Sequence, residues 1–297
     1  MEVVPSEASV AITEGHLSAT VADVTRPWSN RQMRALGDAL RDGTPIPKGC
    51  PTYDEVVLWY VDLTVMIQDR ISRIDWSPLL GGEAPEITSR VKTIGTLQDK
   101  LRRTPEAPLQ TIRDIAGVRF EAMMSTSVQD AAVQAICGLF EDEAAAVVKD
   151  MRRDDHFGYR AVHIELRFHT IAWRAEIQVR TALQGQWANM YEIAADILGR
   201  EIRYSSPEEG TVEYGVVTAM RGISTETVAV AEERYDAVTM QEILVEDLAR
   251  LGNSARLQME QRKLRQLRGE AEPLTVSLTS QLERITSLLQ DIRKSGS

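Results

Sequence analysis

The two runs RAVHIELRF (160–168) and AWRAEIQVR (172–180) decide the fold, because apolar and polar residues alternate through both. Alternation with a period of two predicts β-strands with one buried and one polar face. The polar face carries charge and hydrogen-bonding groups: His163, Glu165, Arg167, Glu176, Gln178 and Arg180. Only residues 169–171 separate the runs, so we expect an antiparallel hairpin. One face would pack on helices and the other would present charge to a cleft.

Helical patterns surround this hairpin. One helix is expected around Asn30–Arg41, and a long amphipathic helix begins at Tyr53. The segment 88–103 predicts a short strand or turn leading into a helix, and 111–124 ends in a β-rich run. Residues 129–150 are expected to form an acidic helix. After the hairpin we expect helices over 181–202, 218–251 and 274–294, with a linker at 269–273.

The bulk composition indicates a soluble globular protein. Of its 297 residues, 43% are hydrophobic and 26% are charged, which is ordinary for a globular chain. Its start lacks the basic and apolar regions of a secretory signal, and we see no membrane-spanning run. We therefore expect a cytoplasmic protein with no membrane association, in which Cys50 and Cys137 are reduced thiols.

The net charge of −10 argues against binding nucleic acid over a broad electrostatic surface. Basic residues nevertheless gather in SRVKTIGTLQDKLRR (89–103) and MRRDDHFGYR (151–160). A locally basic cleft in an acidic protein suits a phosphate-rich small ligand or one end of an RNA.

The first candidate for chemistry is the spacing Arg90, Lys92, Thr96, Lys100. Arg90 and Lys92 alternate on an extended segment, and Thr96 and Lys100 lie one helical turn apart. Three cations and a hydroxyl that converge at a helix start would hold a polyphosphate. Taken alone, a solvated basic helix face is the commoner explanation of such a pattern.

Two carboxylates form the second candidate. Asp114 stands in RDIAGVR at a strand edge, where a carboxylate is a good Mg²⁺ ligand. Glu176 lies on the polar face of the second strand, so the two acids could bracket one Mg²⁺. For Asp114 alone, a helix cap or an ion pair with Arg113 or Arg119 is the commoner role.

The third candidate is the segment HFGYRAVHIEL (156–166). Gly158 permits close approach of the backbone to a ligand, and Tyr159 offers a ring on which a base can stack. His163 projects from the polar strand face, although a lone histidine is more often a hydrogen-bonded structural residue.

The order of these blocks is more specific than any one of them. The succession R-x-K-x(3)-T-x(3)-K, R-D-I-x-G-x-R, G-Y-R-x-x-H, E-I-Q-x-R-T and W-A, from Ser89 to Tyr204, resembles the synthetase domain of the RelA/SpoT family. The resemblance implies an α+β fold, with a nucleotidyltransferase-like mixed β-sheet flanked by helices. From this resemblance and the composition of the flanking segments, we expect an N-terminal extension (1–52), partly disordered, a synthetase domain (53–204) and a helical C-terminal region (205–297).

The same resemblance implies an activity and assigns roles to residues. Members of the family transfer the β,γ-pyrophosphate of ATP to a 3′-hydroxyl and release AMP. On this pattern Arg90 lies against the adenine, with Arg119 also in the ATP site, and Mg²⁺ is bound by Asp114 and Glu176, the latter also accepting the hydroxyl proton. The ATP phosphates are held by Lys92, Thr96 and Lys100. The acceptor is bound by Tyr159, His163 and Gln178.

Three departures from the family pattern bear on the acceptor. Asp155, His156 and Phe157 replace the usual Lys-x-Asn, which leaves Arg152 and Arg153 as candidates to contact acceptor phosphates. A second arginine expected beside the adenine is absent, because 120–134 holds no Lys or Arg. The ending W-A-N-M-Y-E (187–192) is similar to that of the toxic small synthetases of toxin–antitoxin and phage-defence systems.

The sequence leaves open which acceptor is used, whether the chain has protein partners, and whether it is catalytically active. The lost Lys-x-Asn favours the tRNA 3′ CCA end as acceptor over a guanine or adenine nucleotide, whereas the net charge opposes extensive tRNA contact. No His-Asp dipeptide marks a hydrolase domain, so we expect a synthetase-only toxin with a neutralising antitoxin. An apolar stripe from Leu274 to Ile292 would pack on its own domain, or else form a homo-oligomer or bind a partner. The alternative of another class is a catalytically inactive binding module.

Overall fold

The computed structural model describes residues 26–153, 156–169, 174–252 and 254–295. Its chain divides into two compact units. The first unit holds the chain up to Glu121 together with Ala131–Asp150 and Val162–Val179. The second holds Ala122–Asp130, Met151–Ala161 and Arg180–Ser297. The boundaries expected at 52/53 and 204/205 stay predictions.

A five-stranded sheet in the order β1-β2-β5-β4-β3 is the centre of the fold. Strand β1 is antiparallel to β2, and β4 is antiparallel to both β3 and β5. The strands are β1 (Glu86–Val91), β2 (Ala116–Ala122), β3 (Ala144–Asp150), β4 (Val162–Phe168) and β5 (Arg174–Thr181). The predicted hairpin is confirmed, with His163 opposite Gln178 and Glu165 opposite Glu176. The predicted class, a mixed sheet flanked by helices, is also confirmed.

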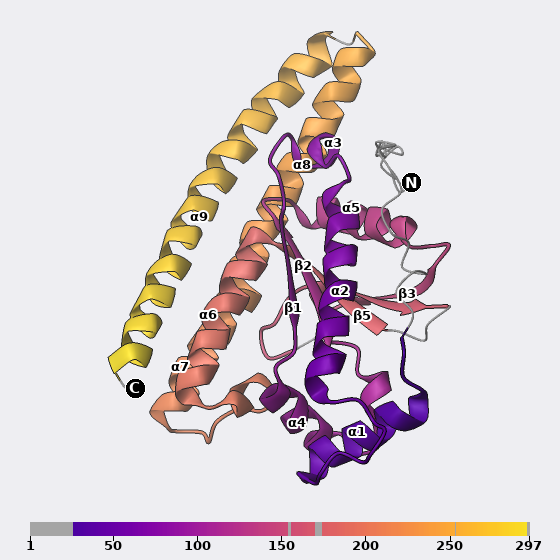
Figure 1. Cartoon of the computed structure of the whole chain (residues 1–297). Helices are drawn as coiled ribbons and strands as arrows, with labels where there is room; N and C mark the ends of the chain where they lie inside the picture. Colours follow the sequence, from indigo (N-terminus) through magenta and orange to yellow (C-terminus); the bar gives the residue numbers. More distant parts are fainter. Residues whose placement is uncertain (1–25, 154–155, 170–173, 253, 296–297) are drawn as a thin grey trace. The chain divides into compact units, whose positions relative to one another are not determined.

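The two faces of the hairpin differ as the alternation predicts. The inward residues of β4, Val162, Ile164, Leu166 and Phe168, are at most 2% exposed. Helix α2 (Tyr53–Ser72) lies along β1 (Figure 1) and buries Val56, Tyr60, Leu63 and Ile67, which recur at helical spacing. Thr52 and Glu55 form a capping box that starts this helix.

Shorter helices complete the first unit. Helix α1 (Asn30–Asp42) begins at the capping box of Ser29 and Gln32 and ends at Gly43, whose φ of 66° is left-handed. Helix α4 (Ile94–Arg103) follows β1 after two residues, as the sequence predicts, and contacts α1. Helix α3 (Ser77–Leu80) and a 3₁₀ turn (Leu109–Thr111) lie in the remaining connections.

The helix expected over 129–150 is wrong in its second half. Helix α5 (Thr126–Leu139) stops before a turn, and Ala144–Asp150 forms the edge strand β3. Alanine favours a helix locally, but pairing with the whole of β4 satisfies this backbone instead. The sequence of this strand lacks the apolar–polar alternation that would predict a strand, because five consecutive residues are exposed.

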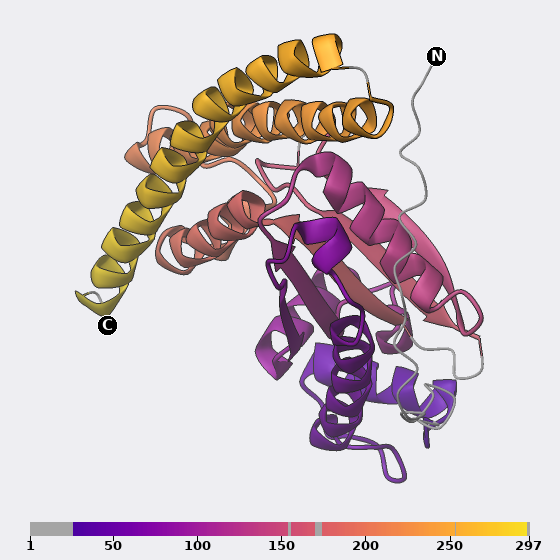
Figure 2. The ribbon, with the colours of Figure 1, turned by 90° about the horizontal axis from the view of Figure 1, so that it is seen from above.

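The second unit is mainly helical, and the predicted helices over 181–202 and 218–251 are present. Its elements are α6 (Ala182–Leu198), a 3₁₀ turn (Arg200–Arg203), α7 (Val212–Gly222), a π-helical segment (Ile223–Val228), α8 (Ala229–Arg250) and α9 (Ser254–Ser295). Figures 1 and 2 show α8 and α9 side by side along much of their length. A capping box of Thr181 and Gln184 starts α6 directly after β5.

The apolar stripe of the last helix packs within its own chain. Leu278 and Leu282 are 2% and 0% exposed, in one cluster with Trp187 of α6. Leu274, Ile285 and Leu289 pack against the same cluster, whereas Ile292 is 55% exposed. Packing on the chain itself, one of the two open expectations, therefore accounts for the stripe up to Leu289.

The linker expected at 269–273 is wrong, because α9 runs through Pro273 without a break. Proline inside a helix removes one backbone hydrogen bond and costs about 3 kcal/mol. Ala271, two residues before Pro273, is buried in a cluster with Val238 and Leu264. This apolar burial offsets the free energy lost with the hydrogen bond. The chain reverses instead at Gly252, whose φ is 71°.

None of the helices in the described ranges combines the length and apolar character that a membrane crossing requires.

Candidate active site

The centre of the candidate site is Asp114, which two lysines contact. Its Oδ2 atom lies 2.9 Å from Lys92 Nζ, and its Oδ1 atom lies 2.7 Å from Lys100 Nζ. Lys92 follows β1, where its backbone N–H donates to Ile115 O at 3.1 Å. Lys100 comes from α4, and Asp114 directly precedes β2 as the chain turns into the sheet. Three segments therefore bring one acid and two bases to one point.

The charge of this cluster is well defined. Burial disfavours the Asp114 carboxylate, but Lys92 and Lys100 outweigh that effect and lower its pKa below 3.8. The lysine side chains are 16% and 30% exposed, so solvent still reaches them. Asp114 is therefore a carboxylate at neutral pH, held between two ammonium groups.

Glu176 of β5 forms the second half of the site. Its Oε1 atom lies 3.3 Å from His163 Nδ1, and its Oε2 atom accepts a hydrogen bond from Gln178 Nε2 at 2.8 Å. Burial raises its pKa, but contacts with His163 and Gln178 outweigh this and lower it overall. The charge of Asp114 acts in the opposite direction, so the two carboxylates lie within electrostatic range of one another.

The other residues expected at the ATP site lie on the polar face of the sheet or at its end. Arg90 is opposite Gly117 and Arg119 is opposite Thr88, so both side chains share one face. Lys92 is the next position of that face. Thr96 Oγ1 donates to Thr93 O at 2.9 Å within the first turn of α4.

Tyr53 supports this region, although no sequence motif marks it. Its hydroxyl donates to the backbone carbonyl of Lys92. Burial raises the pKa of Tyr53 to about 12, so it stays a hydrogen-bond donor at neutral pH. The only signal was its position at the start of an amphipathic helix, which does not identify a partner across 39 residues.

The residues expected to bind the acceptor divide between the two units. His163 and Gln178 belong to the first unit, whereas Tyr159, Arg152 and Arg153 belong to the second. The hydroxyl of Tyr159 accepts a hydrogen bond from Arg180 Nη2 at 3.0 Å, and the guanidinium lies 5.3 Å from its ring centre. Arg153 is exposed.

Arg152 already has several partners. It contacts Asp130 at 2.6 Å, Gln129 at 3.0 Å and the carbonyl of Thr126 at 3.3 Å, and its side chain is 10% exposed. In this conformation its donors are directed into the second unit.

The loop before Tyr159 has a strained backbone. Phe157 has a φ of 58°, a left-handed conformation that bulky residues rarely adopt. Arg221 lies 4.8 Å from the centre of its ring, a cation–π contact that holds it there. Phe157 stands where the family pattern has asparagine, which tolerates this conformation better.

The two carboxylates suit Mg²⁺, whose preferred ligands are oxygen atoms and which usually retains several waters. Asp114 and Glu176 repel one another electrostatically, and a divalent cation between them would relieve that repulsion. Lys92 and Lys100 neutralise Asp114 in the structure, and both could turn to phosphate oxygens once a cation took their place. The described residues contain no group of three or more metal-ligating side chains, so substrate oxygens and water would complete the coordination.

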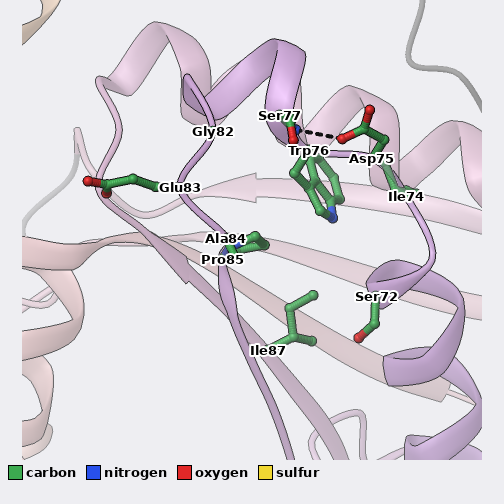
Figure 3. A pocket seen from close by; sticks show the side chains of 10 residues that line it. All are labelled: Ser72, Ile74, Asp75, Trp76, Ser77, Gly82, Glu83, Ala84, Pro85 and Ile87. Carbon is green, nitrogen blue, oxygen red and sulfur yellow. Dashed lines mark hydrogen bonds between the residues drawn. The ribbon is translucent and has the colours of Figure 1, made fainter.

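A pocket of about 370 Å³ lies elsewhere in the first unit. Figure 3 shows it lined by Trp76, Pro85 and Ile87, with Ser77 N donating to Asp75 at 3.0 Å. Trp76 is 4% exposed and packs edge-on against Phe120. The pocket includes none of the candidate site residues.

Comparisons with known proteins agree with the motif order. The family model described as a region found in RelA/SpoT proteins matches residues 89–199. Uncharacterized proteins of Mycobacterium tuberculosis and Mycobacterium bovis are 47% identical over 196 residues, covering 65% of this chain and 68% of each relative.

Solved structures give a more distant likeness. Small alarmone synthetase 2 from Bacillus subtilis is 22% identical, with a TM-score of 0.49, covering 63% of this chain and 98% of its own. A GTP pyrophosphokinase family protein from Streptococcus pneumoniae is 20% identical, with a TM-score of 0.49, covering 65% and 97%. The ordered motifs and the family match together show that residues 89–199 of this chain form a RelA/SpoT-family synthetase region.

Proposed function

We propose that the protein is an ATP-dependent pyrophosphokinase that transfers the β,γ-pyrophosphate of ATP to a ribose 3′-hydroxyl and releases AMP. The observation that supports this most is the pairing of Asp114 with Lys92 and Lys100, within electrostatic range of Glu176. A protein that only binds its ligand has no need for two neighbouring carboxylates opposed by two lysines.

In the proposed reaction the acceptor 3′-oxygen attacks the β-phosphorus of ATP. A new bond forms between the 3′-oxygen and the β-phosphorus. The bond from the β-phosphorus to the oxygen that bridges the α- and β-phosphorus atoms breaks, and AMP leaves with that oxygen. Glu176 accepts the hydroxyl proton, since its lowered pKa leaves it ionised. His163 and Gln178 hold its two oxygens in place.

Charge neutralisation accounts for the remaining groups. Lys92 and Lys100 would bind the ATP phosphates, with Arg90, Thr96 and Arg119 beside them on the same face or helix. Mg²⁺ bound by Asp114 and Glu176 would offset the negative charge that develops on the transferred group. Preorganised charges of this kind lower the barrier without any covalent intermediate.

For the acceptor we propose the tRNA 3′ CCA end, and hence a growth-inhibiting toxin held in check by an antitoxin protein. Asp155, His156 and Phe157 replace the basic Lys-x-Asn segment, which weakens the case for a guanosine polyphosphate. Tyr159 would stack on the acceptor base. The second candidate is synthesis of (p)ppGpp or (p)ppApp, in which a guanine or adenine nucleotide is the acceptor.

The test is transfer of label from γ-³²P-ATP to deacylated tRNA, GTP, GDP or ATP by the full-length protein. We expect labelled tRNA that loses its label on removal of the terminal adenosine, together with release of AMP. Label confined to a nucleotide would transfer the assignment to the second candidate. Glu176→Gln removes the proton acceptor but retains the shape, so we expect a loss of at least about 100-fold in rate.

A catalytically inactive binding module is the alternative of another class. It predicts no transfer to any acceptor and an unchanged effect on growth when Glu176→Gln is expressed. Thermal unfolding of this variant close to that of the parent excludes misfolding as the cause of lost transfer.

A further inference from the structure

Basic side chains lie near Glu165 on the polar face of the sheet. Lys149, Arg167 and Arg174 come from β3, β4 and β5, and Arg113 comes from the segment before β2. Glu165 Oε1 lies 2.7 Å from Lys149 Nζ and 2.5 Å from Arg113 Nη1. Arg167 follows Glu165 on the same face of β4, directly opposite Arg174 of β5. We call Arg113, Lys149, Arg167 and Arg174 the hairpin basic cluster.

This cluster has an excess of positive charge. Glu165 forms ion pairs with Arg113 and Lys149, and in the described part of the chain neither Arg167 nor Arg174 pairs with a carboxylate. Like charges directly opposite one another on a sheet are destabilising. Burial, and then the charges of Arg167 and Arg113, lower the pKa of Arg174. Arg174 Nη1 donates to the carbonyl of Thr111 at 3.4 Å, and the charge of Glu165 partly offsets the repulsion. Basic groups still outnumber the single carboxylate, and this excess favours binding of an anion.

The hairpin basic cluster lies next to the candidate catalytic carboxylates within the same unit. Glu165 is the direct cross-strand partner of Glu176, and Lys149 is the partner of His163. Arg174 precedes Glu176 by two residues on one strand face, a separation of about 7 Å. An anion at the cluster is therefore within reach of a ribose whose 3′-hydroxyl lies at Glu176.

We propose that the hairpin basic cluster binds phosphate groups on the 5′ side of the acceptor ribose, an inference that rests on the proposed function. Arginine forks pair with phosphate oxygens through two hydrogen bonds, and Lys149 adds a point charge. The cluster would thereby supply the basic contact that the sequence of 155–157 lacks. Arg152, the other candidate for that contact, already binds Asp130 and Gln129.

Binding without turnover tests this directly. The probes are a fluorescein-labelled single-stranded RNA ending in CCA and GTP, each added to the full-length protein without ATP. The variant is Arg167→Ala with Arg174→Ala, which leaves both ion pairs of Glu165 intact. We expect affinity for the RNA to fall on the order of tenfold and the slope of log K against log salt to decrease by about 1.4.

A matched control separates a local site from a general charge effect. Arg262→Ala with Arg265→Ala removes the same charge from two exposed positions of α9, and we expect affinity for both probes to stay within about twofold of the parent. Removal of two opposed cations should also leave the thermal midpoint of the Arg167/Arg174 variant unchanged or higher. The Lys-for-Arg double variant should retain most of the salt dependence.

The outcomes are distinct. If the Arg167/Arg174 variant loses affinity for the RNA alone, the cluster binds phosphates of the RNA backbone. If it loses affinity for GTP alone, or for both probes, the cluster binds the 5′ phosphates of the acceptor nucleotide itself. Unchanged binding of both probes, or an equal fall in the α9 control, overturns the proposal. Because no chemistry is measured, binding that depends on the cluster without any transfer contradicts the proposed function and leaves this site standing.

Discussion

At the scale of single residues, Asp114 shows how a charge is fixed by its neighbours. Its pKa is lowered because two lysines outweigh its burial. A group whose folded pKa lies below the unfolded value contributes stability above the unfolded value, and this contribution is lost as the pH falls through the folded value. The stabilisation from Asp114 is therefore complete above about pH 5 and disappears progressively below pH 4.

Asp114→Asn tests this sign. At pH 7 we expect the free energy of unfolding of the variant to be about 1.5–3 kcal/mol lower than that of the parent, because Lys92 and Lys100 lose a charged partner. The difference from the parent should shrink as the pH falls from 5 to 3. Urea denaturation at each pH measures it, with Asp62→Asn at an exposed position of α2 as the control. A difference that stays constant down to pH 3 contradicts the assignment.

Some of the candidate site follows from sequence because its residues belong to ordered motifs. The alternation in β4 and β5 predicts that His163, Glu176 and Gln178 share one face, and the structure has them in hydrogen-bonding contact. Tyr53 and Glu165 could not be assigned roles in this way. Their partners are distant in sequence, and a buried tyrosine or a strand glutamate carries no pattern that specifies its contact.

At the scale of elements, the loop carrying Tyr159 is held by close packing. A Cβ at Gly158 would lie 3.0 Å from Trp187 Cζ2 and 3.1 Å from Arg221 Cα, and its φ is 83°. Both the space and the backbone conformation therefore require glycine. The loop is therefore packed directly against Trp187 of α6 and Arg221 of α7.

Gly158→Ala should destabilise the protein by about 1–3 kcal/mol. It should also reduce binding of the acceptor more than binding of ATP. The control is Gly215→Ala in α7, where a Cβ meets nothing within 4 Å, and here we expect stability to rise by about 0.5–1 kcal/mol. Thermal unfolding measures the stability of both variants, and separate titrations with ATP and with the acceptor measure binding. Equal thermal midpoints for Gly158→Ala and Gly215→Ala would contradict the packing argument.

Element boundaries were predicted well where caps are explicit and poorly where tertiary pairing decides. The capping boxes at Thr52 and Thr181 start α2 and α6. In contrast, Ala144–Asp150 reads locally as a helix and becomes a strand only because β4 is available as its partner. Pro273 reads as a break but is tolerated because the helix around it is buried against α8.

At the scale of the whole molecule, the second unit is assembled from three separate parts of the sequence, and α8 joins them. Glu232, 3% exposed, lies 2.7 Å from Arg160 and accepts hydrogen bonds of 2.7 Å from both Thr181 and Gln184. Helix α8 is therefore part of the structure that holds the segment next to Tyr159 and the start of α6.

Glu232→Ala removes the carboxylate partner of Arg160, whose side chain is 15% exposed and retains its hydrogen bond to Arg152 O. The loss should cost about 3 kcal/mol of unfolding free energy. Glu232→Gln should cost less, because an amide still accepts from Thr181. Glu233→Ala, an exposed neighbour on the same helix, serves as the control. Guanidinium unfolding measures the series, and a Glu232→Ala variant as stable as the control would mean that α8 does not hold these segments.

The contact between Asp236 and the start of α5 has a consequence for biosynthesis. Asp236 accepts hydrogen bonds from the backbone N–H and the hydroxyl of Ser127, both at 2.9 Å, and from the Thr126 hydroxyl. More than a hundred residues separate these partners along the chain, so a ribosome has translated most of the message before this helix start acquires its carboxylate. A nascent chain halted before α8 thus lacks a finished second unit, and full assembly waits for the last third of translation.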